Sequence, residues 1–294
     1  MLFPSICDVI RNLSGMWQLL FKDKYVKYFD VPQTYKDDIG GAFYIHEMQT
    51  LREDLGKLAG REITDEDLQN SIAVYNENRR VINEVYQLRA KQPWQVPTSE
   101  IYLLLRAGMV LPVEEHTQLL RDYLAAAGAE ERPRRDNCRV VVNGVFCEQP
   151  PLGLIKSLEM AGCYVVDDDF LLITRWLIDD VPTTGDPMDN LSKAFLHHSA
   201  ATSAKFEPDK ADKGKFLINQ VRNSGAEGVI FAAPSFCDPA LLDRPMLQEA
   251  LNRDDIPYTA FKYAENTGQM QAIREQAGTF AESIKLWWSK KLPC

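Results

Sequence analysis

The stretch that decides the fold begins with Arg139-Val140-Val141-Val142 and ends with Cys163-Tyr164-Val165-Val166, two apolar runs of the strand type. Residues 151–161 lie between them and are predicted to form a helix that Gly162 closes. Two parallel strands need a long crossover between them, and a helix is the usual crossover. The segment therefore predicts an α/β fold.

The same alternation continues toward the end of the chain. We expect helices at 187–199, 213–223, 240–252 and 269–287, and further strands at 228–232 and 256–261. Strands that alternate with helices predict a doubly wound parallel sheet of the flavodoxin or Rossmann type. Ligand sites in such sheets lie at the carboxyl ends of the strands, so functional residues are expected directly after the strands.

The part of the chain before this sheet is predicted to be mostly helical. Residues 2–20 read as a short apolar piece, a turn and a helix, and residues 45–127 carry helical signals. The polar and charged segment 130–137 separates this region from the sheet. We therefore predict two domains. The first, 1–133, contains the remnant of a first α/β half and a helical block between the halves, and the second, 134–294, is a C-terminal α/β domain.

Composition excludes several classes of protein. The 33 Lys and Arg residues against 42 Asp and Glu residues give a net charge of −9, which argues against a nucleic-acid partner. No apolar run is long enough to cross a membrane, and the first residues do not resemble a secretory signal, so a cytoplasmic location is expected. In that reducing compartment the six cysteines are expected to be thiols or ligands. Glycine-rich phosphate-binding motifs are absent from the sequence.

The most specific feature is a repeated pentapeptide, Pro4-Ser5-Ile6-Cys7-Asp8 and Pro234-Ser235-Phe236-Cys237-Asp238. Each copy follows a strand-like run and precedes a predicted helix, with its aspartate expected to be the N-cap. A cysteine beside a helix N-terminus has a lowered pKa, and iron–sulfur clusters are bound by thiolates. We predict that Cys7 and Cys237 are ligands of one cluster, the alternative being convenient turns with buried, inert thiols.

The other cysteines differ in their position on the predicted strands. Cys147 follows a strand at its carboxyl end, so it is a candidate third ligand, although a loop thiol without a role is about as consistent with this position. Cys138 and Cys163 lie at the opposite ends of strands, where a core role is favoured.

Further segments of the sequence resemble the 2-hydroxyacyl-CoA dehydratase / benzoyl-CoA reductase family. Besides the two cysteine turns, they are 140–144, 158–168 and 265–274. The resemblance covers essentially the whole chain. Residues 234–243 and 261–269 are most similar to the smaller catalytic-type subunit of the ATP-dependent (class I) benzoyl-CoA reductases.

This resemblance implies a function in electron transfer to an acyl-CoA. It implies a [4Fe–4S] cluster held between two α/β halves, a homologous cluster-bearing subunit, separate ATP-hydrolysing activator-type subunits, and ferredoxin as the electron donor. The implied reaction reduces benzoyl-CoA to a cyclic dienoyl-CoA. Family members carry a longer N-terminal segment with an earlier cysteine ligand. The sequence is therefore expected to be truncated, or another residue such as Cys147 completes the site.

Such a reaction needs groups that tune the cluster and move protons. Ser5 and Ser235 could donate hydrogen bonds to cluster sulfides, with ordinary turn capping as the alternative. Glu148 and Glu265 follow predicted strands and could relay protons, with solvated loop acids as the alternative.

Three other functions remain open from the sequence. A 2-hydroxyacyl-CoA dehydratase subunit would use the same cluster for a ketyl-radical elimination of water. A non-catalytic scaffold subunit would carry the cluster for a partner, and a plain flavodoxin-like binding domain would have inert thiols. Iron and sulfide analysis separates the last from the rest, and the acyl-CoA activity of the whole complex separates the others.

Overall fold

The computed structural model describes residues 1–129, 131–145, 150–169, 175–200, 213–264 and 270–288. Its packing divides the chain into two compact units, 1–76 with 177–211 (unit 1) and 77–176 with 212–294 (unit 2). The domain boundary predicted at residue 133 is a different division and stays a prediction. Each unit is described by itself.

Unit 1 is mainly helical and contains a small parallel sheet. Its elements are β1 (Leu2–Pro4), α1 (Asp8–Leu20), β2 (Lys27–Phe29), a π-helical turn (Asp37–Gly41), α2 (Ala42–Ala59) and α7 (Pro187–His197). Strand β1 pairs in parallel with β2, with Phe3 opposite Tyr28. The sequence did not predict β2. The two strands and the helix between them form one β-α-β unit. That this region is the remnant of a first α/β half stays a prediction.

Unit 2 contains the larger sheet. Its elements are α4 (Thr98–Ala107), α5 (Val113–Ala129), β3 (Cys138–Asn143), α6 (Leu152–Met160), β4 (Cys163–Asp168), α8 (Lys213–Ser224), β5 (Gly228–Pro234), α9 (Asp238–Arg253), β6 (Tyr258–Tyr263), α10 (Met270–Ser283) and a final π-helical turn (Ile284–Trp288). Helix α3 (Asp65–Lys91) contributes residues to both units.

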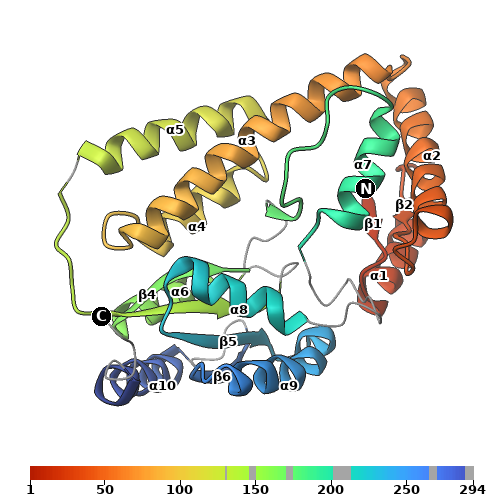
Figure 1. Cartoon of the computed structure of the whole chain (residues 1–294). Coiled ribbons are helices and arrows are strands. Elements are labelled where there is room, and N and C mark those ends of the chain that lie inside the picture. The colour runs from red at the N-terminus through yellow and green to blue at the C-terminus, as the bar shows by residue number, and fades with distance from the viewer. Residues whose placement is uncertain (130, 146–149, 170–174, 201–212, 265–269, 289–294) are drawn as a thin grey trace. The chain divides into compact units, whose positions relative to one another are not determined.

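The four strands of unit 2 form a parallel sheet in the order β4-β3-β5-β6, with helices on both sides (Figure 1). Alternate residues of the strands face opposite layers. Val140 and Val142 pack in one core with α6 and α10, whereas Val141 packs in a second core with α8 and α9. The doubly wound sheet predicted from the sequence is thus confirmed. The direction of winding reverses between β3 and β5, which is the usual place for a ligand site in this fold.

Helix ends follow the local sequence. Thr64 caps α3, because its hydroxyl accepts a hydrogen bond from the Asp67 N–H at 3.1 Å and the Asp67 carboxylate accepts one from the Thr64 N–H at 2.9 Å. Helix α2 ends at Gly60, which has the left-handed φ of 66° that favours glycine.

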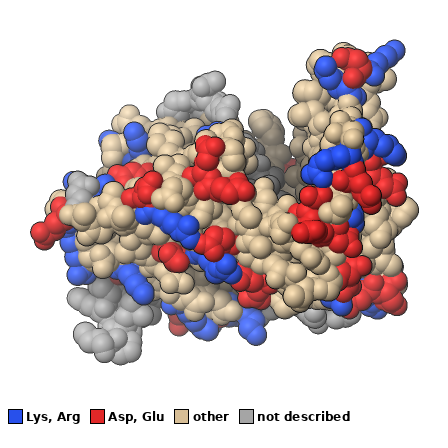
Figure 2. Space-filling model, turned by 90° about the horizontal axis from the view of Figure 1, so that it is seen from above, with Lys and Arg blue, Asp and Glu red and all other residues tan. Residues whose placement is uncertain are grey.

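The described surface carries charges of both signs. On the face shown in Figure 2, Lys and Arg side chains lie interspersed with Asp and Glu side chains. None of the described helices combines the length and the apolar character needed to cross a membrane.

Candidate functional site

The two cysteine turns begin in the same way, at the end of a parallel strand. Pro4 is the last residue of β1 and Pro234 is the last residue of β5. In the first turn the Ser5 N–H donates to the carbonyl of Phe29, the last residue of β2, at 3.0 Å. In the second, the N–H of Ser235 donates to the last carbonyl of β6, at 2.8 Å. The serine therefore ties each turn to the neighbouring strand.

The two turns also end in the same way, at a helix. The Cys7 carbonyl accepts from the Arg11 N–H and the Cys237 carbonyl accepts from the Leu241 N–H, each at 3.2 Å. The prediction that each repeat joins a strand to a helix is confirmed. The prediction that the aspartates are the N-caps was wrong by one residue. The cysteines are the N-caps, because their carbonyls accept the first helical hydrogen bonds, and the aspartates occupy the first helical positions.

This arrangement suits thiolate ligands. Cys7 and Cys237 are half-buried, they are not in disulfides, and each lies at the positive end of a helix of more than three turns. The two cysteines belong to different units, and the described residues contain no group of three or more His, Cys, Asp or Glu side chains placed to hold a metal ion. The donor chemistry of each turn fits a cluster, while the complete ligand set stays a prediction.

The two serine side chains have defined roles in the turns. The Ser5 hydroxyl oxygen accepts a hydrogen bond from the Val31 N–H at 2.7 Å. The Ser235 hydroxyl donates to the Tyr263 carbonyl at 3.0 Å. Both hydroxyls therefore anchor the turns to the following strands, which is the turn-capping alternative. A bond to a cluster sulfide stays a prediction.

Three predicted site residues, Cys147, Glu148 and Glu265, lie outside the described residues. The predicted core cysteines lie within them. Cys138 and Cys163 are buried and face each other across the β3–β4 pair. Burial raises the pKa of the Cys138 thiol and raises that of Cys163 to about 12, so both are kept protonated. Their core role is confirmed.

The sequence did not predict a buried charge cluster at the carboxyl end of β4. Helix α3 contributes Tyr86 and Arg89, which are three residues apart and thus on one face. The Arg89 Nη1 lies 2.7 Å from the Asp168 carboxylate, and the Tyr86 hydroxyl donates to the same carboxylate at 3.2 Å. Both cationic groups of the cluster lie over the Tyr86 ring, with Cζ of Arg175 at 3.7 Å and Cζ of Arg89 at 4.3 Å from its centroid.

Burial and neighbouring charges both shift the pKa values of Arg89 and Tyr86. Burial lowers the pKa of Arg89, but the charges of Asp168, Tyr86 and Asp167 and the hydrogen bond to Asp168 together outweigh this effect and raise the pKa overall, so the guanidinium stays charged. Burial raises the pKa of the Tyr86 phenol. Two buried donors of Arg89, Nε and Nη2, have no hydrogen-bond partner in the described part of the chain.

A signal for this cluster was present in the sequence. Three aspartates, Asp167-Asp168-Asp169, follow an apolar strand at its carboxyl end, and isolated acids are seldom buried there without cations. The cations come from α3 and from Arg175, and the sequence pattern does not indicate that these segments reach the end of β4.

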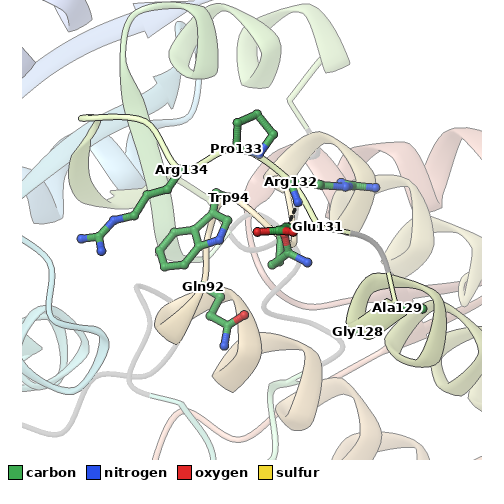
Figure 3. A pocket seen from close by; sticks show the side chains of 9 residues that line it. Gln92, Trp94, Gly128, Ala129, Glu131, Arg132, Pro133 and Arg134 are labelled. Atoms are coloured by element: carbon green, nitrogen blue, oxygen red, sulfur yellow. Dashed lines mark hydrogen bonds between the residues drawn. The ribbon is translucent and has the colours of Figure 1, made fainter.

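A separate pocket of about 670 Å³ lies where α3 ends and the segment after α5 returns to the sheet (Figure 3). Its lining residues are Gln92, Trp94, Gln95, Gly128, Ala129, Glu131, Arg132, Pro133 and Arg134. The Arg134 Cζ lies 5.0 Å from the Trp94 ring centroid, and Arg132 Nη1 lies 2.8 Å from the Glu100 carboxylate. None of the predicted site residues that the structure describes lines this pocket.

The two strand–cysteine–helix turns on parallel sheets are candidate sites for thiolate ligands of a cluster. Comparison of the sequence with known proteins gives the family. The chain belongs to the family described as 2-hydroxyglutaryl-CoA dehydratase, D-component, which it matches over residues 1–284. It is 64% identical to a benzoyl-CoA reductase subunit of Thauera aromatica over 287 residues, which cover 98% of this chain and 74% of that protein.

More distant relatives are dehydratase subunits. The chain is 25% identical to the (R)-phenyllactyl-CoA dehydratase beta subunit of Clostridium sporogenes, over 97% of this chain and 75% of the relative. It is 26% identical to the beta subunit of (R)-2-hydroxyglutaryl-CoA dehydratase of Acidaminococcus fermentans, over 96% and 74%. The family resemblance expected from the two turns is confirmed.

Proposed function

We propose that the chain is a cluster-bearing subunit of an ATP-dependent benzoyl-CoA reductase, which reduces benzoyl-CoA to a cyclic dienoyl-CoA. The observation that carries the proposal is the 64% identity to a benzoyl-CoA reductase subunit over nearly the whole chain. The dehydratase relatives are far less similar, at 25% and 26% identity.

In this proposal Cys7 and Cys237 bind a [4Fe–4S] cluster, with Cys147 as a third ligand. The bound cluster would supply electrons at low potential. The support from the chain is local: two N-cap cysteines, each following a parallel strand and lying beside the amides that begin a helix. A helix N-terminus carries partial positive charge, and iron–sulfur clusters are bound by negatively charged cysteine ligands.

The neighbouring residues would shape the reducing site. Ser5 and Ser235 hold the turns in place, and each lies two residues before its cysteine, where it is proposed to tune the cluster. Phe236, next to Cys237, is 90% exposed, so this turn presents an apolar ring where a dry acyl-CoA pocket is needed. Glu148 and Glu265 are proposed proton relays for the reduced ring.

The proposal also requires partners. They are a homologous cluster-bearing subunit, ATP-hydrolysing activator-type subunits and ferredoxin, in a complex of heterotetrameric type that works under anaerobic conditions in the cytoplasm. The described residues of the chain itself form parallel sheets of flavodoxin type, and its sequence has no phosphate-binding loop for ATP.

A second candidate function is that of a 2-hydroxyacyl-CoA dehydratase subunit, which would eliminate water through a ketyl radical. The family description and the dehydratase relatives favour it. Both functions need the same cysteine ligands, so the substrate distinguishes them.

The deciding experiment compares substrates in the intact complex. The chain is purified anaerobically with its co-purifying partners and supplied with ATP, reduced ferredoxin and either benzoyl-CoA or a 2-hydroxyacyl-CoA. We expect dienoyl-CoA formation that depends on ATP, and no activity from the isolated polypeptide. Dehydration of the 2-hydroxyacyl-CoA without reduction of benzoyl-CoA would favour the second candidate. Ring reduction by the polypeptide alone would contradict the multi-subunit proposal.

A further inference from the structure

The cluster at the end of β4 contains three carboxyl groups and two guanidinium groups. Arg89 pairs with Asp168 at 2.7 Å, and Arg175 pairs with Asp167 at 2.8 Å. The third carboxyl group, Asp169, is 8% exposed. Among the described residues, two cations therefore balance two of the three acids, and Asp169 is the acid that remains.

Asp169 receives its hydrogen bonds from uncharged groups of β3 and the residue after it. The Asn143 amide donates to its Oδ2 at 3.0 Å, and the Gly144 N–H donates to its Oδ1 at 2.6 Å. A buried carboxylate without a cation is costly, and neutral donors offset only part of that cost. Geometry alone thus favours a protonated Asp169 over an ionised one near neutral pH.

The charges around Asp169 act in the same direction. Burial is the largest effect and the Asp168 charge adds to it, with a smaller contribution from Asp167, and they outweigh the Gly144 hydrogen bond to raise the Asp169 pKa to about 7. The positive charges that face this region, Arg89 from α3 and Arg175, are held by the other two aspartates. The Tyr86 hydroxyl likewise donates to Asp168.

Asp169 also lies at the edge of the sheet where the chemistry is proposed. Asn143, its hydrogen-bond partner, is the last residue of β3 and pairs with Phe231 of β5. Strand β5 then continues to Pro234 and into the turn that bears Cys237. Asp169 and the Cys237 turn therefore share the carboxyl edge of one sheet within unit 2, on strands that are two spacings apart, or about 10 Å laterally.

We propose that Asp169 holds a proton in the resting enzyme and serves as a buried proton store for the reduction. The inference deepens the proposed function and rests on it. As an electron supplied by reduced ferredoxin reaches the acyl-CoA, negative charge builds up at this edge. The O–H bond of Asp169 then breaks, its proton moves toward the reduced substrate, and the carboxylate formed is stabilised by Asn143 and Gly144. Solvent returns the proton before the next turnover.

The first test measures the proton directly and does not depend on activity. Infrared difference spectra of the full chain, recorded between pH 5 and 9, should show a protonated carboxyl band that titrates near neutral pH. Asp169→Asn should abolish the band, while Asp122→Asn, at an exposed aspartate on α5, should leave it unchanged. A wild-type chain without such a band, or an Asp169→Asn chain that keeps it, would overturn the proposal.

A second variant keeps the test decisive if Asp169→Asn does not fold. Asn143→Ala removes a donor that stabilises the ionised carboxylate, so the band should titrate at a higher pH. A midpoint that does not move would show that the titrating group is not Asp169.

The third measurement links the proton to turnover. In the intact complex with benzoyl-CoA, Asp169→Asn should lower the rate of reduction at least tenfold, and the change of rate near neutral pH should disappear from its pH profile. Asp122→Asn should keep the wild-type rate and the wild-type pH profile. A normal rate and profile in Asp169→Asn would overturn the proton-store role while leaving the proposed function standing. A wild-type complex that shows the infrared band but does not reduce benzoyl-CoA would instead overturn the proposed function.

Discussion

The turn at residues 4–8 and the turn at residues 234–238 share the backbone hydrogen bonds at their two ends but differ inside the turn and in their surroundings. The Ile6 N–H donates to the Pro4 carbonyl at 2.8 Å in the first turn, whereas the Cys237 N–H donates to the Pro234 carbonyl at 3.2 Å in the second. Strand β5, which leads into the second turn, is buried at all seven positions. Strand β1 has three residues, and only Phe3 is buried. The repeated pentapeptide thus begins at a strand end and ends at a helix start in both places, whereas the sheet behind it determines how firmly the turn is held.

This contrast has a physical basis. The second turn grows from a central strand with neighbours on both edges and helices on both faces, so local opening would expose a continuous core. The first turn grows from a two-stranded sheet, and the helix after it exposes Val9, Met16 and Leu20. We therefore expect the two cysteines to share a chemical role but to differ in the stability of their supports.

The largest effect should come from the cysteines themselves. Cys7→Ser and Cys237→Ser should each remove the iron and visible absorbance of this subunit's cluster from the anaerobically purified complex, while the cluster of the homologous subunit remains, because a serine hydroxyl is not ionised as a thiolate is. Far-UV circular dichroism should stay unchanged. Full iron content in either variant would break the equivalence of the turns and remove that residue from the ligand set. Cys163→Ser, at a buried core thiol, is the control that should retain iron.

The next largest effect should be a pH dependence of stability in the larger sheet. Asp169 titrates near 3.8 when unfolded and near 7 when folded, so between these values the native chain holds a proton that the unfolded chain has lost. Raising the pH from 4 to 7 should therefore remove a stabilising contribution of Asp169 to the free energy of unfolding, of about 3–4 kcal/mol. Amide hydrogen exchange of β3 would measure this loss as the difference between the wild type and Asp169→Asn, because the other carboxyl groups titrate in both. If hydrogen exchange of β1 showed an equal pH dependence, the effect would not be specific to the larger sheet, and this prediction would be contradicted.

Truncation of side chains in β5 and β1 should show how differently the two strands stabilise their turns. Ile230 of β5 is fully buried, so Ile230→Ala should destabilise unit 2 by about 3 kcal/mol. Leu2 of β1 is 45% exposed, and Leu2→Ala should cost less than about 1 kcal/mol. Denaturant unfolding followed by hydrogen exchange in each strand would measure both. Comparable losses would mean that the first turn is held as firmly as the second.

The smallest effect should come from the serines. Ser235→Ala removes the hydroxyl bond to the Tyr263 carbonyl and Ser5→Ala removes the acceptor of the Val31 N–H, each worth about 1 kcal/mol. If the hydroxyls only anchor the turns, the reduction potential of the complex should not change. A shift in potential in either variant would show that its serine also acts on the cluster.

The sequence predicted the parts of the molecule that depend on local pattern. The apolar runs around Val140, Val165, Ile230 and Ala260 are strands, as expected, because buried parallel strands are continuous apolar segments. Strand β2 (Lys27–Phe29) was missed, because three half-exposed residues leave no alternating pattern to detect. The cysteine turns were found because their sequence repeats.

The charge cluster of unit 2 could not be predicted in the same way. Arg89 lies 79 positions before Asp168 in the sequence, and nothing local to either residue indicates their pairing. A buried ion pair depends on tertiary packing, which brings α3 to the end of β4. Local sequence therefore revealed the candidate ligands, while the acid–base groups around them required the structure.

The two thiols that face each other between β3 and β4 have a practical consequence. Cys138 and Cys163 stay protonated and are buried away from solvent. Alkylating reagents and oxidants attack thiolates, so they should not react with these two cysteines while the protein remains folded. Of the described cysteines, only those of the two turns are then open to modification. Damage by air or by a labelling reagent would start at Cys7 and Cys237, and the reactivity of the other pair would report unfolding.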